Sequence, residues 1–288
     1  MMHKGENLKT KSIVFLGLTK NSAKTLSYFL NFFQKIKKEY KNCYLIIGEN
    51  DSTDDTKKIL NKLSKKDDNF FLVDTSFAKK FKFRLEKMAN LRESLKIEIR
   101  KIKKKIDYVC WFDLDDVLEN SLNVKKFVES NKKLEADKKL FGLSSNSKPY
   151  YYDILSFRKK NFFTKNIYII SLNKNLISGF SLRKKFIYDI QKKIMKTKDI
   201  YTISSFNGMC IYYYKYFKLS SYLEKKKIMR SQVEHVTFNK KIHNKTKKMI
   251  LLDKNFVLNL PKEHRPYDNL ISFCFGKLIF YFLKLLKP

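Results

Sequence analysis

The sequence predicts an α/β fold in which a mostly parallel central sheet is flanked by helices. Apolar runs of strand length alternate with longer amphipathic stretches up to residue 113, which is typical of strand–helix–strand units. Acidic motifs follow two of the predicted strands, at the carboxyl ends where sheets of this kind bind ligands. The 288 residues are 43% hydrophobic, which is enough for a sizeable core and too much for a disordered chain.

Four strands and three helices account for the first part of the chain. The strands are predicted at residues 12–18, 42–48, 69–74 and 107–113, and the helices at 22–40, 54–65 and 84–105. Ser52 is expected to cap the second helix, with Asp54 and Asp55 in its first turn, where the helix dipole favours acidic groups.

Beyond residue 120 the pattern is less regular. Strands are predicted at 140–145, 166–172 and 209–214, with a helix at 182–196, and the Lys-rich stretch 239–248 is interpreted as a linker. The chain is therefore divided into a polar N-terminal segment (1–11), a main α/β domain (12–248) and a C-terminal segment (249–288).

The C-terminal segment contains an apolar stretch at 270–286, in which Lys277 and Lys284 fall on one helical face. It fits a helix lying in the membrane interface better than a transmembrane span, and a terminal helix packed on the core is the alternative. The N-terminus is polar and has no apolar signal core. We expect a cytoplasmic location with peripheral contact to the inner membrane face.

The charge balance is strongly basic, with 62 Lys and Arg against 28 Asp and Glu, a net charge of +34. Such a charge suits a partner such as nucleic acid or an anionic membrane. However, the cations are mostly lysine, and with abundant Asn, Ile, Phe and Tyr this is the mix that AT-biased codon usage produces. We expect dispersed charge and no nucleic-acid partner, and keep a basic nucleic-acid-binding protein as an alternative.

The acidic turn Asp113-Leu114-Asp115-Asp116 ends the fourth predicted strand. Carboxylates two residues apart point the same way from an extended backbone, so Asp113 and Asp115 can address one Mn²⁺ or Mg²⁺ ion. Such an ion also binds substrate phosphates and stabilises the charge that develops on a leaving diphosphate. We therefore assign the catalytic role to Asp113, Asp115 and Asp116, with Asp113 and Asp115 as metal ligands.

Two other interpretations fit the same turn. With Val117 it resembles the nucleophile loop of haloacid-dehalogenase-type phosphatases, in which the first Asp attacks phosphorus. That class needs a second acidic motif downstream and usually opens its domain with this loop, and neither feature is found here. A purely structural acidic strand end is the other interpretation, although three Asp in four residues repel one another unless a cation is present.

A set of motifs resembles GT-A-type glycosyltransferases, and more closely the mannan-polymerase and fungal capsule mannosyltransferase group. The motifs are 49–56 (ENDSTDDT), Arg84 with 88–92, 111–116 (WFDLDD), 151–154 with Arg158, 205–208 (SFNG) and 234–236 (EHV). The resemblance covers roughly residues 12–240 and implies a GT-A fold. One departure is Glu93, where Asn is expected, and it puts the role of that helix in doubt.

The resemblance implies a metal-dependent transfer of a hexose from a nucleoside diphosphate sugar to a glycan or lipid-linked acceptor, and it suggests GDP-mannose as the donor. Glu49 and Asp51 would line the nucleoside pocket. Arg92 would reach the donor diphosphate, with Arg84 also on the substrate side, and an ion pair with a neighbouring acid is the alternative for Arg92.

The resemblance also implies roles for residues late in the chain. His235 would complete the metal site opposite the acidic turn, next to Glu234 on the substrate side; a packed or surface histidine is the alternative. The sugar and acceptor side would be formed by Tyr152, Asp153, Arg158, Asn207 and Gly208. For these residues a buried tyrosine and an ordinary turn are the competing interpretations.

Overall fold

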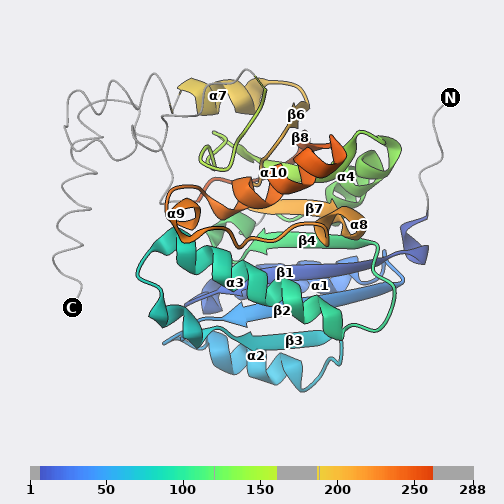
Figure 1. Cartoon of the computed structure of the whole chain (residues 1–288). Coiled ribbons are helices and arrows are strands. Elements are labelled where there is room, and N and C mark those ends of the chain that lie inside the picture. The colour runs from blue at the N-terminus through green and yellow to red at the C-terminus, as the bar shows by residue number, and fades with distance from the viewer. Residues whose placement is uncertain (1–6, 120, 161–186, 188, 262–288) are drawn as a thin grey trace.

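The computed structural model describes residues 7–119, 121–160, 187 and 189–261, and it confirms the α/β class. Within these residues the chain forms a mixed, mostly parallel sheet of eight strands in the order β3-β2-β1-β4-β7-β5-β8-β6, with helices on both faces (Figure 1). The strands are β1 Ser12–Thr19, β2 Asn42–Glu49, β3 Phe70–Asp74, β4 Tyr108–Asp113, β5 Leu140–Lys148, β6 Ile200–Thr202, β7 Met209–Tyr213 and β8 Met249–Asn259.

The helices fill the connections between these strands. They are α1 Ala23–Ile36, α2 Thr56–Ser64, α3 Arg84–Glu98, α4 Val124–Ala136, α7 Asp189–Lys196, α8 Tyr214–Phe217, α9 Lys226–Met229 and α10 Glu234–Thr246. Short 3-10 turns are η1 Leu8–Thr10, η2 Ser76–Lys80, η3 Ile99–Lys101 and η4 Asp116–Leu118.

The strand register brings the ends of several strands to one edge of the sheet. β1 pairs in parallel with β2 and β4, and β2 pairs in parallel with β3, so that Thr19 lies opposite Glu49 and Glu49 opposite Asp74. β7 runs antiparallel to β4 and begins at Met209, opposite Phe112. The start of β7 and the ends of β1 to β4 therefore share what we call the carboxyl edge.

Apolar side chains pack on both faces of the sheet. On one face Phe15 and Phe112 meet α1, and the rings of Phe29 and Phe112 stack with centroids 3.9 Å apart. On the other face Trp111 and Leu95 belong to a cluster covered by α3 and α10 (Figure 1). Burial on both faces explains why the β1 and β4 sequences are almost continuously apolar rather than alternating.

Three predicted helices differ from the structure at their ends. α1 ends at Ile36, before the predicted residue 40. α2 begins at Thr56, and the Ser52 hydroxyl accepts a hydrogen bond from the Asn21 N–H (2.9 Å) instead of capping the helix. The carboxylate of Asp54 instead accepts hydrogen bonds from the N–H groups of Thr56 (3.0 Å) and Ala23 (3.1 Å), which begin α2 and α1. The third helix ends as a regular helix at Glu98 and tightens into η3, short of the predicted residue 105.

The predicted linker at 239–248 is wrong, because most of it lies in α10. His235, Phe238, Asn239 and Ile242 recur at helical spacing and are buried, so the lysines lie on the other sides of a packed helix. The following residues form β8, which lies between β5 and β6 inside the sheet. The sheet thus continues past residue 248.

Two predicted segments, the strand at 166–172 and the apolar stretch at 270–286, lie outside the described residues, while α7 falls within the predicted helix 182–196. In the part of the chain that the structure describes, none of the helices has both the length and the apolar character needed to cross a membrane.

Gly17 of β1 provides a test of the core. A Cβ placed there would lie 2.6 Å from the Phe112 ring, which is held by its stack on Phe29. Gly17→Ala should lower the free energy of unfolding by about 1–3 kcal/mol, because the stacked ring has little room to move. Urea denaturation measures this, with Asn61→Ala on the exposed face of α2 as the control. An unchanged unfolding midpoint for Gly17→Ala would show that the Phe29–Phe112 stack yields easily.

Candidate functional site

The site is built around Asp113, the last residue of β4. Its N–H donates to the Gly208 carbonyl (2.9 Å), which fixes Asp113 beside the turn that leads into β7. Its Oδ2 accepts from the Tyr152 hydroxyl (3.3 Å). Three segments that are far apart in the sequence therefore meet at the carboxyl edge.

The turn before β7 has two consecutive residues with left-handed backbone, Asn207 (φ +57°) and Gly208 (φ +88°). A Cβ on Gly208 would lie 2.9 Å from the Tyr152 hydroxyl and 3.1 Å from a Val117 methyl. Glycine is needed here both for the backbone conformation and for the approach of Tyr152 to Asp113.

Asn207 ties this turn to the segment that follows β5. Its Oδ1 accepts from the N–H groups of Tyr152 (3.1 Å) and Asp153 (3.3 Å), and the Asp153 carboxylate accepts in return from the Asn207 N–H (3.4 Å). The side chain is fully buried, and within the described residues its Nδ2 has no hydrogen-bond partner. The structure thus brings together Tyr152, Asp153, Asn207 and Gly208, and their role on the sugar and acceptor side stays a prediction.

Arg92 lies behind Asp113 as a buried cation. Its Nε donates to Glu234 Oε1 (2.9 Å), and its NH2 group lies 3.6 Å from Asp113 Oδ1. The guanidinium lies 4.7 Å from the centroid of the Trp111 ring and 5.1 Å from that of Phe206. Arginine suits this place because its planar group can stack and bind carboxylates at once. An ion pair between Arg92 and an acid, which was the alternative interpretation from the sequence, is therefore present.

The surroundings of Asp113 act on the pKa of its carboxyl group in opposite directions. Burial raises the pKa of this carboxyl, and the nearby charges of Asp115 and Asp153 raise it further, whereas Arg92 and the Tyr152 hydrogen bond lower it. The three carboxyl groups are therefore close enough to affect one another. A divalent cation between them would relieve this repulsion.

Asp115 and Asp116 lead into the turn η4. Asp115 is exposed and caps this turn, with Oδ1 accepting from the Val117 N–H (3.0 Å), and Asp116 is partly exposed. An acidic cap and an exposed carboxylate are compatible, because one oxygen of the group can cap while the other faces solvent.

Glu49 and Asp51 shape the turn after β2. Glu49 is buried, and its Oε1 accepts from the Ser52 N–H (2.6 Å). Asp51 has left-handed backbone (φ +50°) and pairs with Lys79 (3.0 Å). Both carboxylates lie at the carboxyl edge, and each has a contact within the protein that helps to shape the turn. The structure does not by itself assign them a ligand.

Two predicted arginines lie apart from Asp113. Arg158 uses its guanidinium to donate to the carbonyls of Leu155 (2.9 Å) and Phe157 (2.7 Å), and burial lowers its pKa while the charge of Asp153 raises it. Arg84 is exposed at the first turn of α3. The structure brings Arg158 near Asp153 and leaves Arg84 on the outer surface.

His235 is buried in α10, where its ring stacks on Phe206 at 4.0 Å between centroids. Neither ring nitrogen has a hydrogen-bond partner within the described residues. Burial and the charge of Arg92 hold its pKa well below its usual range, so the imidazole is neutral. A neutral imidazole is the form that binds metal ions.

The described residues do not assemble a complete metal site from protein ligands. No group of three or more His, Cys, Asp or Glu side chains among them is placed to hold an ion. Mg²⁺ and Mn²⁺ sites that bind nucleotides commonly use one or two carboxylates and take the remaining ligands from phosphates and water. The carboxylates of Asp113 and Asp115 meet that smaller requirement.

Sequence reasoning missed residues that position the loops of the carboxyl edge. Asn21 has left-handed backbone (φ +54°) and accepts from the Thr53 N–H through its Oδ1 (2.8 Å), which joins the turns after β1 and β2. Ser145 donates to the Asn207 carbonyl (2.6 Å) from inside β5. An Asn shortly after a predicted strand was the available signal for Asn21, and Ser145 offered none.

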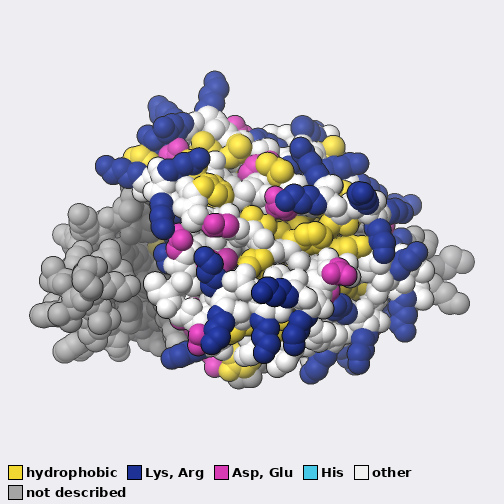
Figure 2. Space-filling view, turned by 90° about the horizontal axis from the view of Figure 1, so that it is seen from below, with side chains coloured by type: hydrophobic (Ala, Val, Ile, Leu, Met, Phe, Trp, Pro, Cys, Tyr) yellow, Lys and Arg dark blue, Asp and Glu magenta, His cyan; other side chains and the backbone are white. Residues whose placement is uncertain are grey.

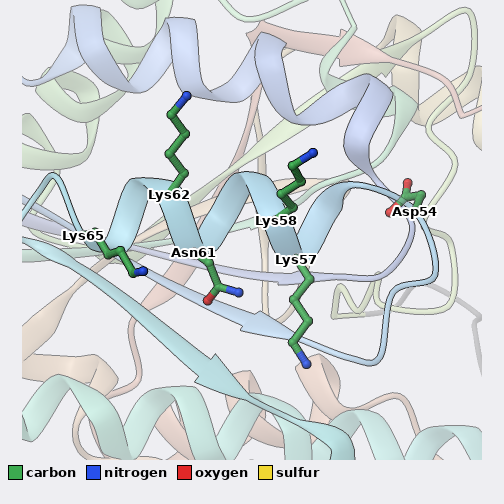
Figure 3. Close-up of a pocket in the computed structure, with 6 residues that line it drawn as sticks. All are labelled: Asp54, Lys57, Lys58, Asn61, Lys62 and Lys65. Carbon is green, nitrogen blue, oxygen red and sulfur yellow. The ribbon is translucent and has the colours of Figure 1, made fainter.

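A shallow hollow runs along α2 and contains none of the predicted site residues. It is lined by Asp54, Lys57, Lys58, Asn61, Lys62 and Lys65 (Figure 3). Lys58 and Lys62 extend on one side of the helix and Lys57 and Lys65 on the other (Figure 3). It is an exposed basic helix face rather than an enclosed site.

Comparison with solved structures shows a GT-A-like fold. The chain is similar to the mannosyltransferase PcManGT from Pyrobaculum calidifontis in complex with GDP-Man and Mn²⁺, at 12% identity and a TM-score of 0.50, covering 93% of this chain and 64% of that one. It is also similar to S. aureus TarS 1-349, at 14% identity, a TM-score of 0.43 and coverage of 88% and 58%.

A third similar structure is glucosyl-3-phosphoglycerate synthase from Mycobacterium tuberculosis in complex with Mn²⁺, UDP and phosphoglyceric acid. The identity is 10% and the TM-score 0.47, over 93% of this chain and 78% of that one. No family model matches the sequence, and no curated protein does. The chain spans 58% of the TarS chain and 64% of the PcManGT chain.

The buried pair of Arg92 and Glu234 provides a stability test for the site. The two side chains are 5% and 6% exposed, so Glu234→Gln leaves a desolvated guanidinium short of one counter-charge. The free energy of unfolding should fall by about 3 kcal/mol, measured by urea denaturation. The matched control is Glu98→Gln, which breaks a pair with the mostly exposed Lys101 and should cost less than about 1 kcal/mol. Equal losses in both variants would contradict a structural role for the buried pair.

Proposed function

We propose that this chain is a metal-dependent glycosyltransferase that moves a hexose from a nucleoside diphosphate sugar to a glycan or lipid-linked acceptor. The observation that carries the proposal is the position of Asp113 at the end of β4. There it lies among Asp115, Asp153, the Tyr152 hydroxyl and buried Arg92, at the edge of the sheet where α/β folds bind ligands. The GT-A-like fold supports it.

In this proposal Asp113 and Asp115 hold Mn²⁺ or Mg²⁺. His235 would become a further ligand only after a rearrangement, because among the described residues it is not grouped with these acids closely enough to hold an ion. When bound, the ion would supply positive charge to the diphosphate that leaves the sugar. The repulsion at Asp113 favours the presence of a cation. The neutral His235 ring has no hydrogen-bond partner among the described residues, so it has a nitrogen lone pair available for such an ion. Asp116, which follows directly, would add negative charge to the same turn.

The remaining chain positions this acidic centre. The Tyr152 hydroxyl orients one oxygen of Asp113, and Arg92 lies near the other, so the carboxylate has a fixed direction. Arg92 thus acts on the donor through Asp113 rather than by reaching the diphosphate from the surface. Glu234 in turn holds the Arg92 guanidinium.

The substrate would be divided between the two sides of Asp113. The turns after β1 and β2 carry Glu49 and Asp51 and would receive the nucleoside, with Arg84 further out on the same side. Asp153, Arg158, Asn207 and Gly208 would face the sugar and acceptor. The resemblance to the capsule mannosyltransferase group and the GDP-Man in the PcManGT complex support GDP-mannose as the donor to test first.

Asp115→Asn tests the metal role of the acidic turn. The change keeps the shape and removes one formal charge at the ion, so hexose transfer should fall by at least about a hundredfold. Stabilisation of the protein by Mn²⁺ alone, measured as a shift in the unfolding temperature, should also be lost. His235→Ala should weaken the Mn²⁺ effect less, because water can replace one ligand.

Asp68→Asn is the matched control, since Asp68 is an exposed acid in the turn before β3, at the opposite edge of the sheet. It should leave both transfer and the Mn²⁺ shift unchanged. The glycosyltransferase proposal fails if Asp115→Asn binds nucleotide sugar and Mn²⁺ as well as the parent protein. Release of phosphate from simple phosphomonoesters, abolished by Asp113→Asn, would instead identify a phosphatase.

A further inference from the structure

Exposed apolar and basic side chains gather around the start of α3, outside the acidic centre, and only Arg84 among them also has a place in the proposed donor side. We call this surface the rim patch and define it by two segments, 76–84 after β3 and 223–230 around α9. Its exposed apolar members are Phe77 (36% exposed), Phe83 (41%), Leu223 (40%) and Ile228 (39%). Its exposed basic members are Lys79, Lys80, Lys82, Arg84, Lys225, Lys226, Lys227 and Arg230.

The two segments form one continuous surface. Arg230 bridges them, because its guanidinium lies 4.1 Å from the centroid of the Phe83 ring and its Nε donates to Glu86 of α3 (3.0 Å). Within the first segment the Lys80 ammonium lies over the rings of both Phe77 and Phe81. Figure 1 shows α9 beside the start of α3, at the end of the sheet where β1 to β4 terminate.

Three acids near the rim patch are already paired. Glu86 is occupied by Arg230, Glu224 pairs with Lys241 (3.0 Å) and Asp51 pairs with Lys79. A fourth, Asp74, accepts from the Ser76 N–H (2.8 Å) just before the first segment. The basic members of the patch outnumber these acids, so the patch keeps an excess of positive charge. On the face seen in Figure 2, Lys and Arg side chains are spread among scattered acidic ones.

We propose that the rim patch binds the surface of an anionic lipid bilayer. Exposed Phe, Leu and Ile side chains can enter the boundary between headgroups and acyl chains, while the lysines around them remain at the level of the phosphates. Both components are present in one patch, and each lysine near a negative membrane surface contributes attraction. None of its residues belongs to the apolar stretch 270–286.

The composition favours a bilayer over a nucleic acid. Single-stranded nucleic acid is bound by aromatic faces that are open for base stacking. Here one face of each of Phe77, Phe81 and Phe83 is covered by Lys80 or Arg230, and two of the four exposed apolar residues are aliphatic. Aliphatic side chains have no aromatic face on which bases can stack, whereas their transfer into lipid is favourable.

Vesicle co-sedimentation with the full chain tests the rim patch. We expect binding to vesicles of phosphatidylcholine and phosphatidylglycerol in a two-to-one ratio, and weak binding to phosphatidylcholine alone. The triple variant Lys82→Glu, Lys226→Glu, Lys227→Glu should reduce the partition coefficient by at least about tenfold. The apolar variant Phe77→Ser, Phe83→Ser, Ile228→Ser should reduce it similarly, and its residual binding should be more sensitive to salt.

The matched control is Lys58→Glu, Lys62→Glu, Lys65→Glu, which makes the same charge change on the exposed face of α2 (Figure 3). It should keep binding within about twofold, because attraction at this distance is screened by salt. Unfolding midpoints verify that all variants fold. Equal loss in the control, unchanged binding in both patch variants, or loss of binding to a single-stranded oligonucleotide without loss of vesicle binding would each overturn the proposal. No donor or metal is needed, so the result is independent of transfer activity.

Discussion

The site depends on one buried cation, the guanidinium of Arg92. It lies between the rings of Trp111 and Phe206 and links Glu234 of α10 to Asp113 of β4. Without it, two acids from distant parts of the chain would share a desolvated region with nothing to offset their charge, which is costly. Arg92 therefore makes it feasible to place a carboxylate at the inner end of a core strand. It also fixes the relative position of α3, α10 and the sheet.

Arg92 offsets only part of the charge around Asp113. Its cation lowers the pKa of the Asp113 carboxyl, whereas burial and the charges of Asp115 and Asp153 raise it. The hydrogen bonds of Asn207 to Tyr152 and Asp153 hold this group of side chains in place despite the repulsion between the acids. Such opposition between scaffold and charge is typical of sites that are completed by a ligand. In our proposal the completing ligand is a metal ion with its diphosphate.

The parts of the fold that the sequence predicted are those governed by local pattern. β1, β2, β3 and β4 are apolar runs between amphipathic helices, and the acidic turn stands out because acids are scarce in this chain. The failures arose where tertiary contacts decide. The lysines of α10 concealed a helix whose inner face is His235, Phe238, Asn239 and Ile242. The place of β8 between β5 and β6 depends on pairing with strands that lie far earlier in the chain. Likewise, Glu234 could be identified as a partner of Arg92 only after α10 was placed.

The charges of the chain are divided between a basic exterior and an acidic centre. The net charge is +34, yet the acidic centre lies at the carboxyl edge, and a donor phosphate would meet repulsion there unless a cation were bound. The basic exterior can attract anionic molecules over a distance of about 10 Å at moderate salt without discriminating among them. In the function that we propose, discrimination is left to the acidic centre, which would accept a phosphate only together with a metal ion. In the function that we propose, a basic surface and an acidic site are therefore complementary: the first raises the local concentration of anions, and the second makes their productive binding conditional on the ion.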